Sequence, residues 1–134
     1  MLSFLEQNNF IIEVLCSAWL AVLFIQSGLD KVTDWKGNLT WLTGHFANSI
    51  FKGSVPLLLG VVTILEVAAG FLSLAGCIAL FFDSSSNLAF YGAALSGVAL
   101  LCLFTGQRIA KDYEGAAGLV PYFIVVIASL FFLQ

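Results

Sequence analysis

The stretch SVPLLLGVVTILEVAAGFLSLAGCIALFF, from Ser54 to Phe82, decides the fold of this chain. It is long and apolar enough for a membrane-spanning helix, and its only charged side chain is Glu66, near the middle. An acidic residue such as Asp at the centre of a bilayer helix costs about 2.5 to 3.5 kcal/mol on insertion scales. Glu66 must therefore be neutral, paired, or turned toward protein or water. Two interpretations stay open: a functional site, or a polar side chain that hydrogen-bonds a neighbouring helix.

The composition of the whole chain indicates a membrane protein. Of 134 residues, 60% are hydrophobic and 10% are charged, and the mean hydropathy is +1.02. Because one span takes about 20 apolar residues, this length leaves room for four spans in a single domain. The net charge is −3 without a cluster of Lys and Arg, so no nucleic-acid partner is expected. No metal site is expected either, because the three cysteines lie singly in apolar runs and the chain has one histidine, His45.

The apolar runs predict transmembrane helices at residues 10–28, 55–82, 88–105 and 117–132. Between the first two, apolar residues recur at steps of three or four, at Trp35, Leu39, Leu42, Phe46 and Ile50. This spacing predicts an amphipathic helix at about 36–51 that lies in the membrane interface. The expected fold is an all-α membrane protein, a four-transmembrane-helix bundle with an amphipathic interfacial helix between helices 1 and 2.

The distribution of basic residues predicts the orientation of the spans. All of them fall in the first and third connections, at Lys31, Lys36, Lys52, Arg108 and Lys111. Cytoplasmic loops carry the excess of Lys and Arg. We therefore expect these two connections in the cytoplasm and both termini outside.

Counting along the helices places the polar residues of the spans at different depths. Glu66 lies about 16 Å from the end of its span that begins at Ser54. Ser96 lies at a similar depth, whereas Gln26 and Lys31 lie near the cytoplasmic mouth. We expect no direct ion pair between Lys31 and Glu66, because it would bridge too much of the membrane unless the helices are offset. Desolvation disfavours an unpaired carboxylate, so we expect Glu66 to be protonated at pH 7 and to donate a hydrogen bond to a neighbouring helix or a ligand headgroup.

Two motifs resemble the DoxX-like family of small four-helix integral membrane proteins. The first is FIQSGLDKVTDW, in which Gly28 to Lys31 match the family's glycine-hydrophobic-x-lysine pattern. The second is ILEVAAGFLSLAG, in which Glu66 is followed by the small residues Ala68, Ala69 and Gly70. The resemblance covers most of the chain in topology and is specific over about residues 22–76. It implies the four-helix fold, a place in the bacterial cytoplasmic membrane, and functional weight on Lys31 and Glu66.

Members of that family are associated with membrane redox systems. The sequence has no haem histidine pair, metal cluster or nucleotide loop that could carry electrons unaided. We therefore expect a non-catalytic accessory subunit of a larger membrane complex, redox-linked, with a quinone or bound lipid in a pocket near Glu66. The expected partners are the lipid bilayer and other membrane protein subunits. The candidates for a ligand site or an interhelix polar site are Glu66, Lys31, Gln26 and Ser96.

Two alternative functions stay open. The first is a quinone-reactive subunit of a membrane oxidoreductase, in which Glu66 donates protons while Lys31 or Gln26 holds the headgroup. The second is a small proton-coupled transporter, a class that also combines four helices with an embedded glutamate.

Overall fold

The computed structural model describes the backbone of residues 2–47, 53–82 and 87–134, and the side chains of this part of the chain from Asn9 onward. Within these residues the chain forms six helices and no strand. The helices are α1 (Leu2–Thr33), α2 (Trp35–His45), α3 (Val55–Phe82), α4 (Asn87–Ile109), α5 (Tyr113–Gly118) and α6 (Val120–Phe132).

Four segments of the described chain are helical, long and apolar enough to cross a membrane. They are Asn9–Thr33 in α1, Val55–Phe82, Asn87–Ile109, and Tyr113–Phe132, which contains α5 and α6. The fourth segment is divided at Leu119, two residues before Pro121. Proline lacks an amide hydrogen, and its ring clashes with the carbonyl four residues earlier in a continuous helix. The helix expected at 117–132 is therefore α6 from Val120 onward, while residues 117 and 118 belong to α5.

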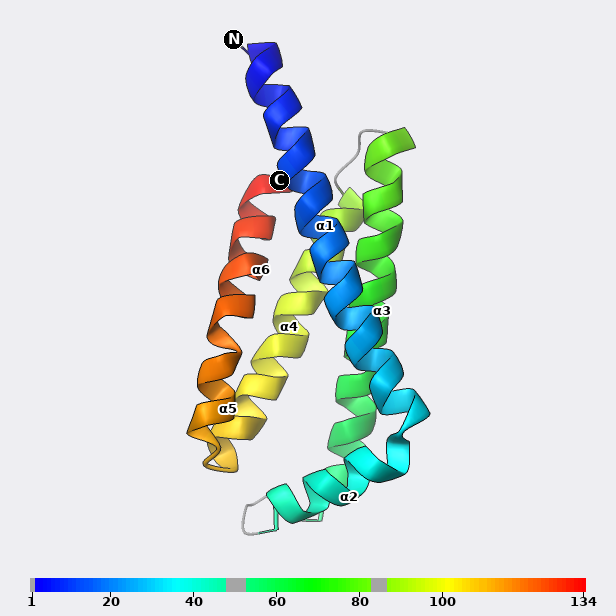
Figure 1. Cartoon of the computed structure of the whole chain (residues 1–134), viewed down its shortest axis with the longest axis vertical. Helices are drawn as coiled ribbons and strands as arrows, with labels where there is room; N and C mark the ends of the chain where they lie inside the picture. The colour runs from blue at the N-terminus through cyan, green and yellow to red at the C-terminus, as the bar shows by residue number, and fades with distance from the viewer. Residues whose placement is uncertain (1, 48–52, 83–86) are drawn as a thin grey trace.

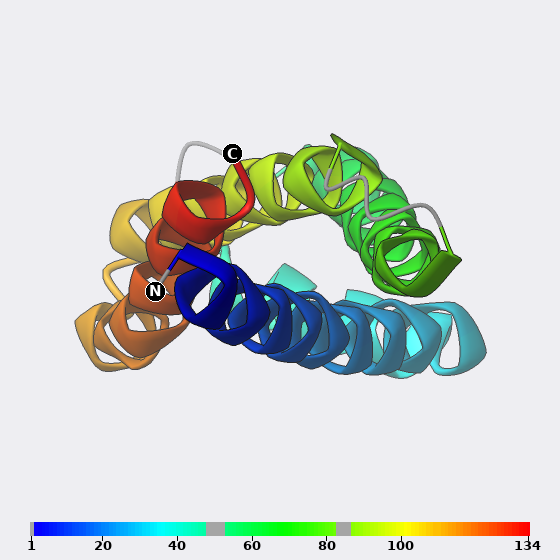
Figure 2. The same cartoon turned by 90° about the horizontal axis from the view of Figure 1, so that it is seen from above.

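α3 lies on the side of the bundle opposite α6 and packs against α1 and against α4 (Figures 1 and 2). α6 packs against α4 and α1. α2 lies across the end of the bundle where α1 ends and α3 begins, and the first turns of α1 extend past the other helices at the opposite end (Figure 1). The buried apolar core comes from α1, α3, α4 and α6 and the residue after it: Leu20, Phe24, Ala69, Leu80, Ala89, Ala93, Ala99, Leu100, Val126 and Leu133.

Small residues bring α3 and α4 into close contact. A Cβ atom on Gly92 would lie 2.6 Å from Ser73 Oγ, and one on Gly76 would overlap the backbone of Ala89. Small side chains at such positions let two helix backbones approach closely. The α3–α4 interface therefore has no space for larger residues at Gly76 and Gly92.

α1 continues to Thr33, past the end expected at residue 28. Three hydrogen bonds at steps of four residues hold its last turns: Gln26 Nε2 to Asp30 Oδ2 (2.9 Å), Lys31 Nζ to Ser27 Oγ (3.0 Å) and Thr33 Oγ1 to Leu29 O (2.8 Å). Side chains four residues apart are neighbours on a helix. The polar residues satisfy one another in helical conformation, so the change to polar sequence does not end the helix.

α2 carries most of its apolar residues on one face. Trp35, Leu39 and Leu42 are half-buried, Lys36 is exposed, and Phe46, just after the helix, is buried. The helix expected at 36–51 begins one residue earlier, at Trp35, and ends earlier than expected, at His45, because Phe46 and Ala47 form a turn. Residues 48–52 lie outside the described part of the chain.

Candidate functional site between α1 and α3

An ion pair joins α1 to α3. Lys31 Nζ lies 3.1 Å from Glu66 Oε2 and donates a second hydrogen bond, of 3.0 Å, to Ser27 Oγ. The Glu66 side chain is fully buried, and the Lys31 side chain is 17% exposed. Carboxylate, ammonium and hydroxyl therefore form one polar cluster between α1 and α3, which we call the Lys31–Glu66 pair.

Two glycines allow α1 and α3 to meet beside this pair. A Cβ atom on Gly70 would lie 2.6 Å from the backbone nitrogen of Ile25, and one on Gly28 would lie 3.2 Å from the backbone nitrogen of Val67. Both distances are too short for a real side chain to fit without movement. The close approach thus depends on glycine on both helices.

The same contacts fix how far α1 is shifted along α3. The two helices are antiparallel (Figure 1), and with Gly28 opposite Val67 the register places Lys31 opposite Ile64. Ile64 is two residues from Glu66, which is about 3 Å along a helix axis. A flexible lysine side chain covers this offset readily, and it does so here.

The expectation that Lys31 and Glu66 are too far apart to pair is therefore wrong. That expectation assumes that Lys31 lies level with the start of α3. In the structure Lys31 lies opposite Ile64, and α3 begins at Val55, about 13 Å earlier along its axis. The first turns of α3 extend past Lys31 and lie beside α2. Because an opposite charge favours an ionised carboxylate, the reason for expecting a protonated Glu66 also disappears.

Both members of the pair have unused hydrogen-bonding capacity. Glu66 Oε1 is buried and has no hydrogen-bond partner within the described residues. An ammonium group has three donors, and Lys31 uses two of them, to Ser27 and Glu66. One acceptor and one donor are thus left side by side. A small group with a hydroxyl and a carbonyl oxygen could satisfy both, and an unsatisfied buried acceptor costs about 1–3 kcal/mol.

Within the described residues, the other two predicted site residues make no hydrogen bond with the pair. Gln26 is exposed on a different stripe of α1, where it donates to Asp30. Ser96 is buried in α4 and donates to Gly92 O at 2.7 Å. The site residue that sequence reasoning missed is Ser27. Its position four residues before Lys31 is the signal that could have indicated it.

A second polar contact links α2 to the turn before α5. His45 Nε2 lies 3.5 Å from Asp112 Oδ2, and the His45 ring stacks on Trp41 with a centroid distance of 4.5 Å. Asp112 also caps α5, because its Oδ1 accepts a hydrogen bond of 2.9 Å from Gly115 N. Within the described residues, no group of three or more His, Cys, Asp and Glu side chains is placed to hold a metal ion.

No protein-family model matches this chain, and no curated protein and no solved structure is similar to it. The resemblance to the DoxX-like family therefore stays a prediction. The Lys31–Glu66 pair has to be interpreted from its own geometry.

Proposed function

We propose that the chain is an integral membrane protein that crosses the bilayer at α1, α3, α4 and α5–α6, with α2 in the interface. Only 17% to 33% of the most apolar part of each span is buried, so most of each helix faces outward. Large apolar side chains are exposed on all four spans, for example Val22, Ile64, Leu101 and Phe131. A soluble monomer rarely exposes continuous apolar surface of this extent. On α2, the exposed Trp41 suits the headgroup level.

We place the end of the bundle that carries α2 in the cytoplasm of a bacterial cell. The His45–Asp112 contact puts the first and third connections at this one end. Within the described residues this end carries the exposed basic side chains of Lys36, Arg108 and Lys111, and basic residues gather on the cytoplasmic side. A phosphatase reporter fused to the C-terminus should be active, because this terminus is then outside. A fluorescent reporter that folds there and requires the cytoplasm would contradict this orientation.

We further propose that the protein is a non-catalytic accessory subunit of a larger membrane complex, and that the Lys31–Glu66 pair holds the polar headgroup of a quinone or lipid. The observation that carries this proposal is the buried, unpartnered Glu66 Oε1 beside the Lys31 ammonium group. Ionisable residues inside a membrane are functional by default. A hydroxyl donating to Oε1 and a carbonyl accepting from Lys31 would complete the hydrogen bonds. The broad outward apolar surface gives neighbouring subunits room to pack.

Membership of the DoxX-like family is part of the same proposal. Its support is that the two motifs meet in space, because the Gly28–Lys31 segment and the Glu66–Gly70 segment form one contact between α1 and α3. Two short motifs that are far apart in the chain thus build a single site.

Purification from native membranes in a mild detergent, followed by native mass spectrometry and lipid extraction, tests the proposal. We expect a protein partner in fixed stoichiometry and a bound quinone or lipid that is lost in Glu66→Gln. Glu114→Gln is the matched control, because Glu114 is exposed in α5 and lies outside the pair.

Other outcomes decide between the functions. A tightly bound quinone without a protein partner would favour the quinone-reactive subunit, for which the adjacent proton acceptor and donor are suitable. A homodimer with neither would favour the transporter. A monomer without partner or ligand, in wild type and Glu66→Gln alike, would refute the proposed function.

A further inference from the structure

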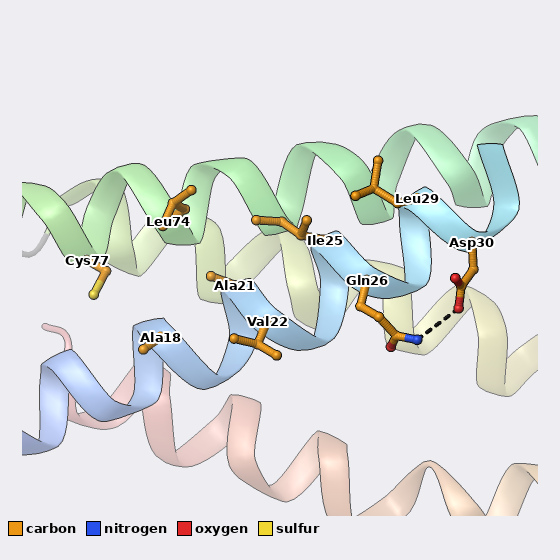
Figure 3. Close-up of a pocket in the computed structure, with 9 residues that line it drawn as sticks. All are labelled: Ala18, Ala21, Val22, Ile25, Gln26, Leu29, Asp30, Leu74 and Cys77. Carbon is orange, nitrogen blue, oxygen red and sulfur yellow. Dashed lines mark hydrogen bonds between the residues drawn. The ribbon is translucent and has the colours of Figure 1, made fainter. Parts of the chain in front are cut away.

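A groove on the outer surface of α1 and α3 lies apart from the Lys31–Glu66 pair. It has a volume of about 540 Å³ and is lined mainly by apolar side chains, with Ala18, Val22, Gln26 and Asp30 along one stripe of α1 and Leu74 and Cys77 from α3 (Figure 3). Ligand sites in proteins have volumes of about 300–1,000 Å³. We call this feature the outer groove.

The length of the outer groove corresponds to one leaflet of a bilayer. Its apolar end is at Ala18 and Cys77, and its polar end is at Gln26 and Asp30 (Figure 3). Ala18 and Asp30 are twelve residues apart in α1, which is about 18 Å; one leaflet contributes about 15 Å of hydrocarbon. Asp30 lies near the end of α1, beside the start of α2. An acyl chain can therefore lie along the groove while its headgroup reaches Asp30.

The polar end of the outer groove is rich in hydrogen-bond acceptors and negatively charged. Asp30 is exposed and accepts from Gln26 Nε2 through Oδ2, and within the described residues its Oδ1 makes no hydrogen bond. The neighbouring cation does not neutralise it, because the Lys31 ammonium group is held by Ser27 and Glu66 on another face of α1. Asp34, one turn further on, is also exposed. This end favours a headgroup that carries a positive charge and N–H donors.

We propose that the outer groove binds a phospholipid of the ethanolamine type from the cytoplasmic leaflet, with one acyl chain along Ala18 and Val22 and its ammonium group on Asp30. Gln26 holds the Asp30 carboxylate in place for this contact. The inference rests on the proposed location in a membrane. It does not depend on a headgroup at the Lys31–Glu66 pair, because different residues form the two sites.

Native mass spectrometry of the delipidated full chain, titrated with ethanolamine and glycerol phospholipids that have identical acyl chains, tests this inference. We expect wild type to bind the ethanolamine lipid roughly tenfold more tightly than the glycerol lipid, because a hydrogen bond to the charged Asp30 carboxylate stabilises binding by at least that factor. Asp30→Asn should bring the ratio of the two affinities close to one, and the exposed Glu114→Gln should leave it unchanged. Glu66→Gln should also leave this ratio unchanged, which separates this site from the pair.

A second pair of variants tests the path of the acyl chain. Val22 is 71% exposed, so Val22→Trp should fold while its ring fills the groove and weakens retention of both lipids. Val98→Trp, at an exposed position on α4, should retain them as wild type does. Equal affinity of wild type for the two lipids, or an unchanged preference in Asp30→Asn, would overturn the inference. Recovery of the protein from the soluble fraction would instead refute the proposed membrane location.

Discussion

Lys31→Met removes the cation of the pair and leaves Glu66 in a site without access to water. The methionine keeps the length and the apolar part of the lysine side chain, so the main change is the loss of the ammonium group. Glu66 is fully buried and cannot turn outward, whereas Lys31 is 17% exposed. We therefore expect Lys31→Met to destabilise the fold more than Glu66→Gln, after which the lysine can still extend its charge to water.

The structure sets the size of this effect. At 3.1 Å and an effective dielectric constant of about 20, the attraction between the two charges is about 5 kcal/mol. We expect Lys31→Met to lower the free energy of unfolding by about 3 kcal/mol at pH 7, as for other buried pairs that lose one partner.

Replacing both partners, as in Lys31→Met with Glu66→Gln, should recover most of the loss, because no uncompensated buried charge remains.

Equilibrium unfolding in mixed detergent micelles at pH 7, followed by circular dichroism, measures these differences. Lys36→Met is the matched control, because Lys36 is exposed in α2 and a surface substitution usually changes stability by less than about 0.5 kcal/mol. Equal stability of Lys31→Met and Lys36→Met would refute the reasoning. A double variant as unstable as Lys31→Met alone would refute its electrostatic part.

Two further substitutions test the packing and the second polar contact. Gly76→Ala should destabilise the fold by about 1–3 kcal/mol, because the new Cβ atom overlaps the Ala89 backbone. Gly44→Ala should instead stabilise α2 by up to about 1 kcal/mol, because a Cβ atom on Gly44 meets open space. Thermal unfolding in detergent measures both variants, and a stability change of the same sign in the two would contradict the close contact between α3 and α4. Asp112→Ala removes the hydrogen bond that caps Gly115 N and should lower the free energy of unfolding by about 1 kcal/mol. Asp112→Asn keeps an accepting oxygen and should keep most of that stability. Equal losses of stability in the two variants would show that the cap contributes nothing.

The long helices could be predicted from the sequence because their apolar runs are long and have few interruptions. The run at 55–82 has the same limits as α3. The end of α1 could not be predicted in this way. Composition records only that charged residues follow Gly28, and it does not show that Gln26 and Asp30 satisfy each other while the helix continues.

The pair itself depends on a quantity that composition does not contain, namely the shift of α1 along α3. Counting residues from each helix end assumes that both helices begin at the same level. The actual shift follows from where Gly28 and Gly70 allow backbone contact. Small residues close to Lys31 and Glu66 were visible in the sequence, but only the packing shows that they face each other. The outer groove could not be predicted for the same reason, because residues of two helices line it.

Infrared difference spectroscopy of wild type against Glu66→Gln at pH 7 tests the central claim most directly, which is that Glu66 is a carboxylate paired with Lys31 inside the bundle. We predict that the substitution removes a band of an ionised carboxylate, and that Lys31→Met replaces this band with one of a protonated acid. A wild-type protein that loses a protonated-acid band in Glu66→Gln would contradict the ion pair.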